Sequence, residues 1–225
     1  MPGFAFPAAV LATASRDYAS AAQMSDLARE TDTAALAAEL ERLKAERDIY
    51  ALLTRYCRGQ DRLDLEMVRS CYHPDAHDNH GGRNDDDAYQ GGVDGLLAWM
   101  HRHVSYGAIG QHFIGNFTVD VQGDVAFSEA YIHSASRRRD QMDKPTMSLI
   151  YVRFYDRVER RDGEHWKIAR RDIVWDSAQV VPNPDDSWTP PSPPSLAGRR
   201  SDDPSVELAA AWREETDSDA PWLGI

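Results

Sequence analysis

The sequence predicts an α+β fold in which helices pack on one face of a curved, mainly antiparallel sheet. Three observations support this prediction. Apolar residues between positions 33 and 104 recur at steps of three and four, which is the helical period. After Gln111, apolar and polar residues alternate, as they do in a half-buried strand. The turn sequences QGD and RDG divide this second region into hairpins.

Three helices are expected before the strands. The first spans residues 33–59, as one helix or as two shorter ones, and a glycine ends it. The second spans residues 65–71, because Asp64 is a favourable N-cap residue and Pro74 follows the segment. The third spans residues 93–104, where the apolar residues fall on one face. The polar stretch between the second and third helices is expected to be loop.

Two extensions flank the predicted domain of residues 33–182. Residues 1–32 lack a clear apolar period and are expected to form an N-terminal arm. Residues 183–225 are rich in proline, which predicts a C-terminal extension with one short helix over residues 204–215. Because disordered tails seldom carry several tryptophans, this extension is expected to be a lid over a pocket or a clasp between subunits. Its tryptophans are Trp188, Trp212 and Trp222.

Charge and composition exclude several classes of function. The net charge is −12, which would repel a phosphate backbone, so no nucleic-acid partner is expected. No apolar run reaches the length of a membrane span. The sequence has no phosphate-binding glycine loop, no GxSxG and no HExxH, which argues against nucleotide-dependent, serine-hydrolase and zincin chemistry. Cys57 and Cys71 are expected to be buried free thiols of a cytoplasmic protein.

Several short motifs occur in an order that is typical of one family. Tyr56 and Asp61 lie near the end of the first helix, CYHPDAHDNHG follows the second, and HFIGN, at residues 112–116, precedes the hairpin QGDVAFSEAYIH. The last hairpin is RVERRDGEHWKIARRDIVWD. Over roughly residues 45–182 the chain resembles the SnoaL-like family of the nuclear transport factor 2-like superfamily. The resemblance implies a cone-shaped α+β barrel around a deep pocket, often assembled into dimers or trimers.

The resemblance also implies a catalytic set. In the members that catalyse eliminations, an aspartate orients a histidine that removes a proton, and the matching residues here are Asp61 and His112. Tyr56 matches a tyrosine that polarises a substrate oxygen. This chemistry suits an imidazole, which can accept a proton near neutral pH, and it requires no cofactor.

Further residues are candidates for substrate binding. The resemblance places His80, with Asp78, at the pocket mouth. The other candidates depend on strand register, because a residue on the concave face lines the pocket and one on the convex face meets solvent. These candidates are Asn116, Tyr131, His133, Arg153 and Trp175.

The histidine-rich run at residues 73–80 admits a second interpretation. His77, Asp78 and His80 could bind a metal ion from a loop. Pro74 directly after His73 argues against two ligands on one helix face, and no second cluster of ligands follows. No metal is therefore expected, and a metal-assisted enzyme is kept as an alternative.

The sequence thus predicts a cofactor-independent lyase, of the dehydratase or the retro-aldol type. Its substrate is expected to be a hydrophobic, hydroxylated aromatic or polycyclic small molecule, because an apolar pocket with few polar groups suits such ligands. An isomerase or polyketide cyclase of the same fold is one alternative. A non-catalytic protein for ligand binding or assembly is another, because the fold alone does not decide function.

Overall fold

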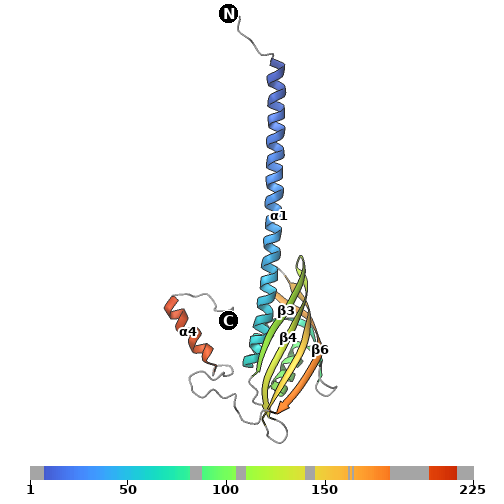
Figure 1. Cartoon of the computed structure of the whole chain (residues 1–225), viewed down its shortest axis with the longest axis vertical. Helices are drawn as coiled ribbons and strands as arrows, with labels where there is room; N and C mark the ends of the chain where they lie inside the picture. The colour runs from blue at the N-terminus through green and yellow to red at the C-terminus, as the bar shows by residue number, and fades with distance from the viewer. Residues whose placement is uncertain are drawn as a thin grey trace, which may run out of the picture. The chain divides into compact units, whose positions relative to one another are not determined.

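The computed structural model describes residues 8–81, 88–104, 110–139, 145–161, 163, 165–182 and 203–216. The chain divides into two compact units, residues 1–45 and 46–225, and α1 contributes to both. Figure 1 follows the order of the elements along the chain. They are α1 (Ala8–Arg62), α2 (Leu65–Ser70), β1 (Tyr72–Gly81), β2 (Tyr89–Gly92), α3 (Val93–Val104), β3 (Gly110–Gln122), β4 (Val125–Arg139), β5 (Pro145–Arg160), β6 (Trp166–Pro182) and α4 (Pro204–Thr216).

The first unit consists of the N-terminal part of α1. Its helix begins at Ala8, so the predicted helix start at residue 33 was wrong, and residues 8–32 of the predicted N-terminal arm are helical. Alanine has the highest intrinsic helix propensity, so an alanine-rich segment can be helical without an apolar stripe. A search for apolar period alone therefore misses such a segment.

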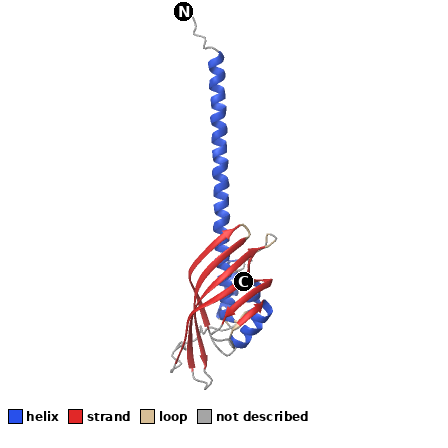
Figure 2. Ribbon diagram, turned by 90° about the vertical axis from the view of Figure 1, so that its right-hand side faces the viewer, coloured by secondary structure: helices blue, strands red, loops and turns tan. Residues whose placement is uncertain are grey.

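The second unit is built on one six-stranded sheet in the order β2-β1-β6-β5-β4-β3. Every neighbouring pair is antiparallel except β1 and β6, which are parallel. Figure 2 shows that the long strands bend along their length, so the sheet is strongly curved. This confirms the predicted α+β fold with a curved, mainly antiparallel sheet. The predicted QGD turn is present at Gly123, and β5 and β6 pair antiparallel on either side of the predicted RDG turn.

The polar stretch after α2 is not loop, as the sequence had suggested, but contains β1 and β2. β1 forms its parallel ladder with β6, about a hundred positions later, with Asp78 opposite Arg171. Backbone pairing with so distant a strand leaves no local signal in the sequence. The buried side chains of β1 include the polar His73 and Asp78 beside Tyr72 and Ala76, so the usual alternation of apolar and polar residues is absent as well.

The helices of the second unit bury apolar stripes. In the part of α1 that belongs to this unit the buried side chains recur at the spacing of one helix face, and they are Ile49, Leu52, Leu53, Tyr56 and Cys57. α3 buries Val93, Leu96, Leu97 and Met100 in the same pattern, as expected. No helix in the described part of the chain is long and apolar enough to cross a membrane.

The junction between α1 and α2 differs from the prediction in one respect. Gly59 does not end α1, which continues to Arg62 and stops at Leu63, where the backbone φ is +51°. A Cβ at position 59 would lie 2.8 Å from Cγ2 of Val68 in α2, so the glycine permits close helix packing. Asp64 caps α2 as predicted, its side chain accepting a hydrogen bond from the backbone N–H of Met67 at 2.9 Å.

A buried ion pair lies within the sheet. Nε and Nη2 of Arg171 on β6 donate to the carboxylate of Asp156 on β5 at 2.7 and 2.6 Å, and both side chains are at most 1% exposed. The guanidinium carbon lies 4.1 Å from the ring centroids of both Tyr56 and Phe154. This charged group therefore joins α1 to the inner face of the sheet.

Candidate active site

The inner face of the curved sheet borders a cavity of about 130 Å³. Its wall is mainly apolar and aromatic, with a small number of polar groups, as is usual for pockets that bind small organic molecules. Residues from α1, α3 and five strands contribute to it. The lining residues that matter for the chemistry are Gln60, Asp61, His80, Trp99, His112, Ser134, Ser136, Ile150, Val152, Phe154, Ile173 and Trp175.

Asp61 and His112 lie in direct contact at this cavity. Nδ1 of His112 is 2.6 Å from Oδ1 of Asp61, and the backbone N–H of His112 donates to Oδ2 at 3.3 Å. Because a carboxylate only accepts hydrogen bonds, Nδ1 carries the proton in this contact. In the neutral ring, Nε2 then keeps its lone pair. This pair has the arrangement of a base oriented by a carboxylate.

His80 forms a second pair of the same kind. It is at the end of β1 and lines the same cavity, and its Nδ1 is 3.2 Å from Oδ1 of Asp78. Asp78, which was predicted to bind substrate, is fully buried and does not line the cavity. Its other oxygen accepts a hydrogen bond from the Tyr72 hydroxyl at 2.7 Å. Asp78 and His80 are two positions apart, so they share a side of β1, but only His80 reaches the cavity.

Asp78 keeps its charge despite its burial. Burial alone would raise the pKa of its carboxyl, but the hydrogen bonds from His80 and Tyr72 and the positive charge of Arg171 outweigh that effect. The net pKa of Asp78 is lowered. The carboxylate behind His80 is therefore an anion at neutral pH.

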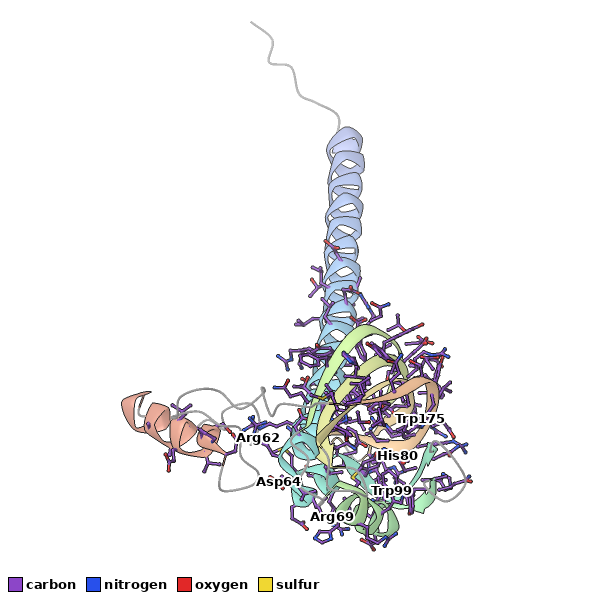
Figure 3. All side chains as sticks on the ribbon, turned by 60° about the horizontal axis from the view of Figure 1, so that its bottom comes forward. Arg62, Asp64, Arg69, His80, Trp99 and Trp175 are labelled. Atoms are coloured by element: carbon purple, nitrogen blue, oxygen red, sulfur yellow. The ribbon has the colours of Figure 1, made fainter. Side chains whose placement is uncertain are left out.

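Two tryptophans flank His80, as Figure 3 shows for the labelled residues. The Trp99 ring centroid is 4.8 Å from that of His80, and the planes are tilted by 52°. Nε1 of Trp175 donates to the backbone carbonyl of His80 at 3.1 Å. Gly81 has a φ of +58°, and a Cβ there would be 3.0 Å from Nε1 of Trp175, so the glycine allows this tryptophan to approach. Trp175 thus lies at the cavity, where the sequence had suggested it.

The other strand candidates lie away from the cavity. Ser134 and Ser136 on β4 line it, so the side chains of Tyr131 and His133 on the same strand point to the opposite face. Likewise Arg153 alternates with the lining residues on β5. These predicted substrate-binding residues therefore do not line this cavity, because register decides the face and the sequence does not fix it.

On the outer face these residues have other partners. His133 stacks on Tyr151 with ring centroids 4.4 Å apart and planes 3° from parallel. Arg153 binds the carboxylate of Asp176 at 2.9 to 3.2 Å and donates to the Tyr155 hydroxyl at 2.7 Å. The outer face of the sheet therefore has its own aromatic and charged network.

Two further predicted residues do not reach the cavity. Tyr56 is fully buried, and its ring packs edge-on against Tyr72 and Phe154. Its hydroxyl accepts a hydrogen bond at 2.9 Å from Gln60, which does line the cavity. Asn116 is exposed on β3, where the register with β4 shifts between residues 114 and 117. Neither side chain lines the cavity, although the sequence had suggested a role at the site for each.

The histidine-rich run divides among three environments. His73 is buried, with Nε2 3.0 Å from the backbone oxygen of Glu159, whereas His80 faces the cavity. His77 is partly buried on β1. In the described ranges, no three His, Cys, Asp or Glu side chains are grouped so that they could hold a metal ion. The convergence of His77, Asp78 and His80 that a metal site requires is therefore not found among these residues.

Sequence reasoning named Asp61, His80, His112 and Trp175 but missed the other lining residues, among them Gln60, Trp99, Ser134 and Ser136. Trp99 belongs to the predicted third helix, one position before the buried Met100, but it is not on the apolar face considered there. Gln60 follows Tyr56 by one helical turn, so the same helix face could have indicated it. The serines could be identified only once the inward face of β4 was known.

A family model and several solved structures match this chain. Residues 41–172 match the model of the SnoaL-like domain family. No curated protein matches the sequence. Among solved structures, a type 2 hexachlorocyclohexane dehydrochlorinase (LinA) aligns with a TM-score of 0.55 at 19% identity, over 70% of this chain and 99% of that one.

Two more solved structures align over similar lengths. A scytalone dehydratase-like protein from Novosphingobium aromaticivorans gives a TM-score of 0.52 at 18% identity, over 65% of this chain and 95% of that one. The Kfla4162 protein from Kribbella flavida gives a TM-score of 0.53 at 12% identity, over 61% of this chain and 95% of that one. At these identities the similarity shows a shared fold.

Proposed function

The chain belongs to the SnoaL-like family, and from this premise we propose that it is a cofactor-independent lyase that uses His112 as a general base. The single observation that supports this most is the contact between Asp61 and His112 at the edge of a largely apolar cavity. Nδ1 of the histidine is engaged by the carboxylate, so Nε2 is the nitrogen that takes a proton from substrate. Asp61 stabilises the imidazolium that forms.

A positioned base of this kind contributes about 10²–10⁴ in rate. The carboxylate acts by fixing the tautomer and orientation of the ring. Both side chains are about one-fifth exposed, at 18% for Asp61 and 20% for His112, so solvent can remove the proton after each turnover.

The cavity wall favours a hydrophobic ring compound as substrate. Trp99, Trp175 and Phe154 present aromatic surface, and Ile150 and Val152 present aliphatic surface. The hydroxyls of Ser134 and Ser136 and the ring of His80 are polar groups that can bind a substrate oxygen. We therefore propose a hydroxylated aromatic or polycyclic substrate, which loses water or a small aldehyde.

The fold of the solved relatives agrees with this class of reaction. The LinA structure is that of a dehydrochlorinase and another relative is scytalone dehydratase-like, and both names describe eliminations from small molecules. An isomerase or cyclase would use the same base to form an enolate without loss of a leaving group. Product analysis separates these two outcomes.

The test is a screen of hydroxylated aromatic and polycyclic compounds, with products identified by mass spectrometry. On an active compound, His112→Gln is expected to lower kcat/KM by about 10²–10⁴. His101→Gln is the matched control, because His101 is exposed on α3 and does not line the cavity. Near-normal turnover by His112→Gln would falsify the proposal.

We also propose that the protein forms a homo-oligomer through the outer face of the sheet. Phe113, Phe127, Tyr131 and Tyr151 are each between 42% and 54% exposed there, and they come from three adjacent strands. Exposed aromatic residues gathered on one face are typical of protein interfaces. Sedimentation of the wild type and of Phe127→Glu tests this: a wild-type monomer at micromolar concentration would contradict it.

A further inference from the structure

We propose that His80 is a second catalytic residue, a general acid that protonates the leaving oxygen, and that Asp78 and Tyr72 are its positioning residues. This inference rests on the proposed function, because it assigns the second proton transfer of the same reaction. It begins from the finding that two histidines at one cavity each have a carboxylate partner.

The two pairs approach the cavity from different parts of the sheet. His80 is on β1 and His112 is on β3, and in the sheet order three strands separate β1 from β3. Curvature of the sheet brings both rings to one cavity. Elimination of water needs a proton removed at one carbon and a proton supplied to the leaving hydroxyl on the next, so it needs two groups in separate positions.

A buried carboxylate and an aromatic ring lie directly against His80. Its partner Asp78 is 0% exposed, whereas Asp61, the partner of His112, is 18% exposed. A buried anion attracts a neighbouring positive charge more strongly than an anion in contact with water, because screening is weaker in the interior. The ring centroid of Trp99 is 4.8 Å from that of His80, which is within the range of a cation–π contact with an imidazolium.

Asp78 is itself fixed in place. The Tyr72 hydroxyl donates to one of its oxygens at 2.7 Å, which leaves the other oxygen for His80 at 3.2 Å. Burial raises the pKa of the Tyr72 hydroxyl well above its ordinary value, so this group remains a hydrogen-bond donor at any working pH. The pair is therefore rigid on the side away from the cavity.

The other charged and titratable groups around the pair do not replace these partners. Arg171 lies behind Tyr72, with its guanidinium carbon 5.9 Å from that ring, and is paired with Asp156. Tyr89 on β2 packs against Trp99 and donates to the backbone oxygen of Gly92, and its pKa is raised by burial. Asp78 is thus the carboxylate that contacts the ring of His80.

The proposed step balances in protons and electrons. Nε2 of His112 takes the proton from a carbon, the electron pair of that C–H bond forms the new C=C bond, and the C–O bond breaks. The leaving oxygen takes the proton from Nε2 of His80 and departs as water. His112 then releases its proton to solvent and His80 takes one up, so neither an oxidant nor a reductant is needed.

The first test compares two leaving groups. A β-hydroxy aryl ketone loses hydroxide, which needs a proton, whereas the matching β-chloro ketone loses chloride, which does not. We expect His80→Gln to lower kcat/KM about 10²–10⁴-fold for the hydroxy compound and less than about 10-fold for the chloro compound. His112→Gln is expected to slow both equally, because both require removal of the same C–H proton. Equal losses for His80→Gln on the two compounds would overturn the acid role.

The positioning residues have a separate readout. Asp78→Asn is expected to move the alkaline limb of the pH–rate profile to lower pH, because the imidazolium loses its buried anion. Tyr72→Phe is expected to move it in the same direction by less. A role in folding alone would lower the amount of active protein and leave the profile in place.

The last test does not depend on turnover. Nitrogen-15 spectra of the histidine rings in the full chain, recorded across a pH series, report the charge state of His80 directly. The His80 imidazolium is expected to persist to higher pH in the wild type than in Asp78→Asn, while His112 is unchanged. Identical titrations overturn the inference even if no substrate is found. A clear difference, combined with normal turnover by His112→Gln, would instead contradict only the proposed base.

Discussion

Nδ1 of His112 lies 2.6 Å from Oδ1 of Asp61, although 51 positions separate the two residues in the chain. Asp61 is in the last turn of α1, and His112 is near the start of β3, an edge strand of the sheet. The contact therefore depends on how the end of the helix packs beside the sheet. A change in either element would move the base relative to the cavity.

Replacing Asp61 by asparagine removes the charge but keeps the size of the side chain. On an active substrate, Asp61→Asn is expected to lower kcat/KM by about 10²–10⁴, because the imidazolium of His112 loses its counter-charge. Asp120→Asn, at an exposed position of β3, is the matched control and should leave kcat/KM unchanged. A loss of less than threefold in Asp61→Asn would show that the carboxylate does not assist the base.

The buried pair of Arg171 and Asp156 is expected to matter for stability. Arg171→Met would leave Asp156 as a buried, unpaired carboxyl and is expected to lower the free energy of unfolding by about 3–5 kcal/mol. Arg170→Met changes the neighbouring residue, which is exposed and pairs with Asp172 on the surface, and should hardly change Tm. Urea unfolding of the two variants checks this, and equal midpoints would contradict it.

Gly81 is expected to be needed for its backbone conformation and for the space that it leaves beside Trp175. Gly81→Ala places a Cβ 3.0 Å from Nε1 of Trp175 at a residue whose φ is +58°. Gly123→Ala is the control, because its φ is +65° but no atom lies within 4 Å of the added Cβ. The backbone cost of about 1–2 kcal/mol should be common to both variants.

The difference between these two glycine variants isolates the effect on Trp175. Only Gly81→Ala is expected to weaken the binding of an aromatic ligand, because the shifted indole would lose its hydrogen bond to the His80 carbonyl. Titration calorimetry with a compound from the screen measures this. Equal affinity in the two variants would mean that Trp175 does not shape the site.

The two thiols are expected to be unreactive in the folded protein. Burial raises the pKa of Cys57 to about 12 and that of Cys71 to about 11, from an ordinary value of 9.0. Iodoacetamide at pH 8 should therefore label neither thiol in the folded protein and both in urea, because the thiolate is the reactive form. Labelling of either thiol without denaturant would contradict this.

The raised thiol pKa values also determine whether stability rises or falls with pH. Because folding raises these thiol pKa values, the folded state binds more protons than the unfolded state at alkaline pH. Their contribution to stability is complete below about pH 9 and is lost progressively as the pH rises from there through 11 to 12. Urea midpoints should fall over this range in the wild type, and the fall should be smaller in Cys71→Ala.

The sequence by itself determined the elements whose signals are local. The stripe of Ile49, Leu52, Leu53 and Tyr56 predicted the part of α1 that packs on the sheet, and Asp64 predicted the start of α2. Alternation and the QGD turn predicted the β3–β4 hairpin. Helical period, capping and turn geometry depend on neighbours a few residues away, so they can be read from a short stretch of chain.

Only the tertiary structure decided which side chains face the cavity. His133 and Ser134 are adjacent in the sequence, yet the first stacks on Tyr151 outside the sheet and the second lines the cavity. A shift of one residue in register exchanges the two faces of a strand, and register depends on partners far along the chain. For the same reason β1 was not predicted, because its ladder forms with β6, and the pairing of His80 with a buried Asp78 became visible only in three dimensions.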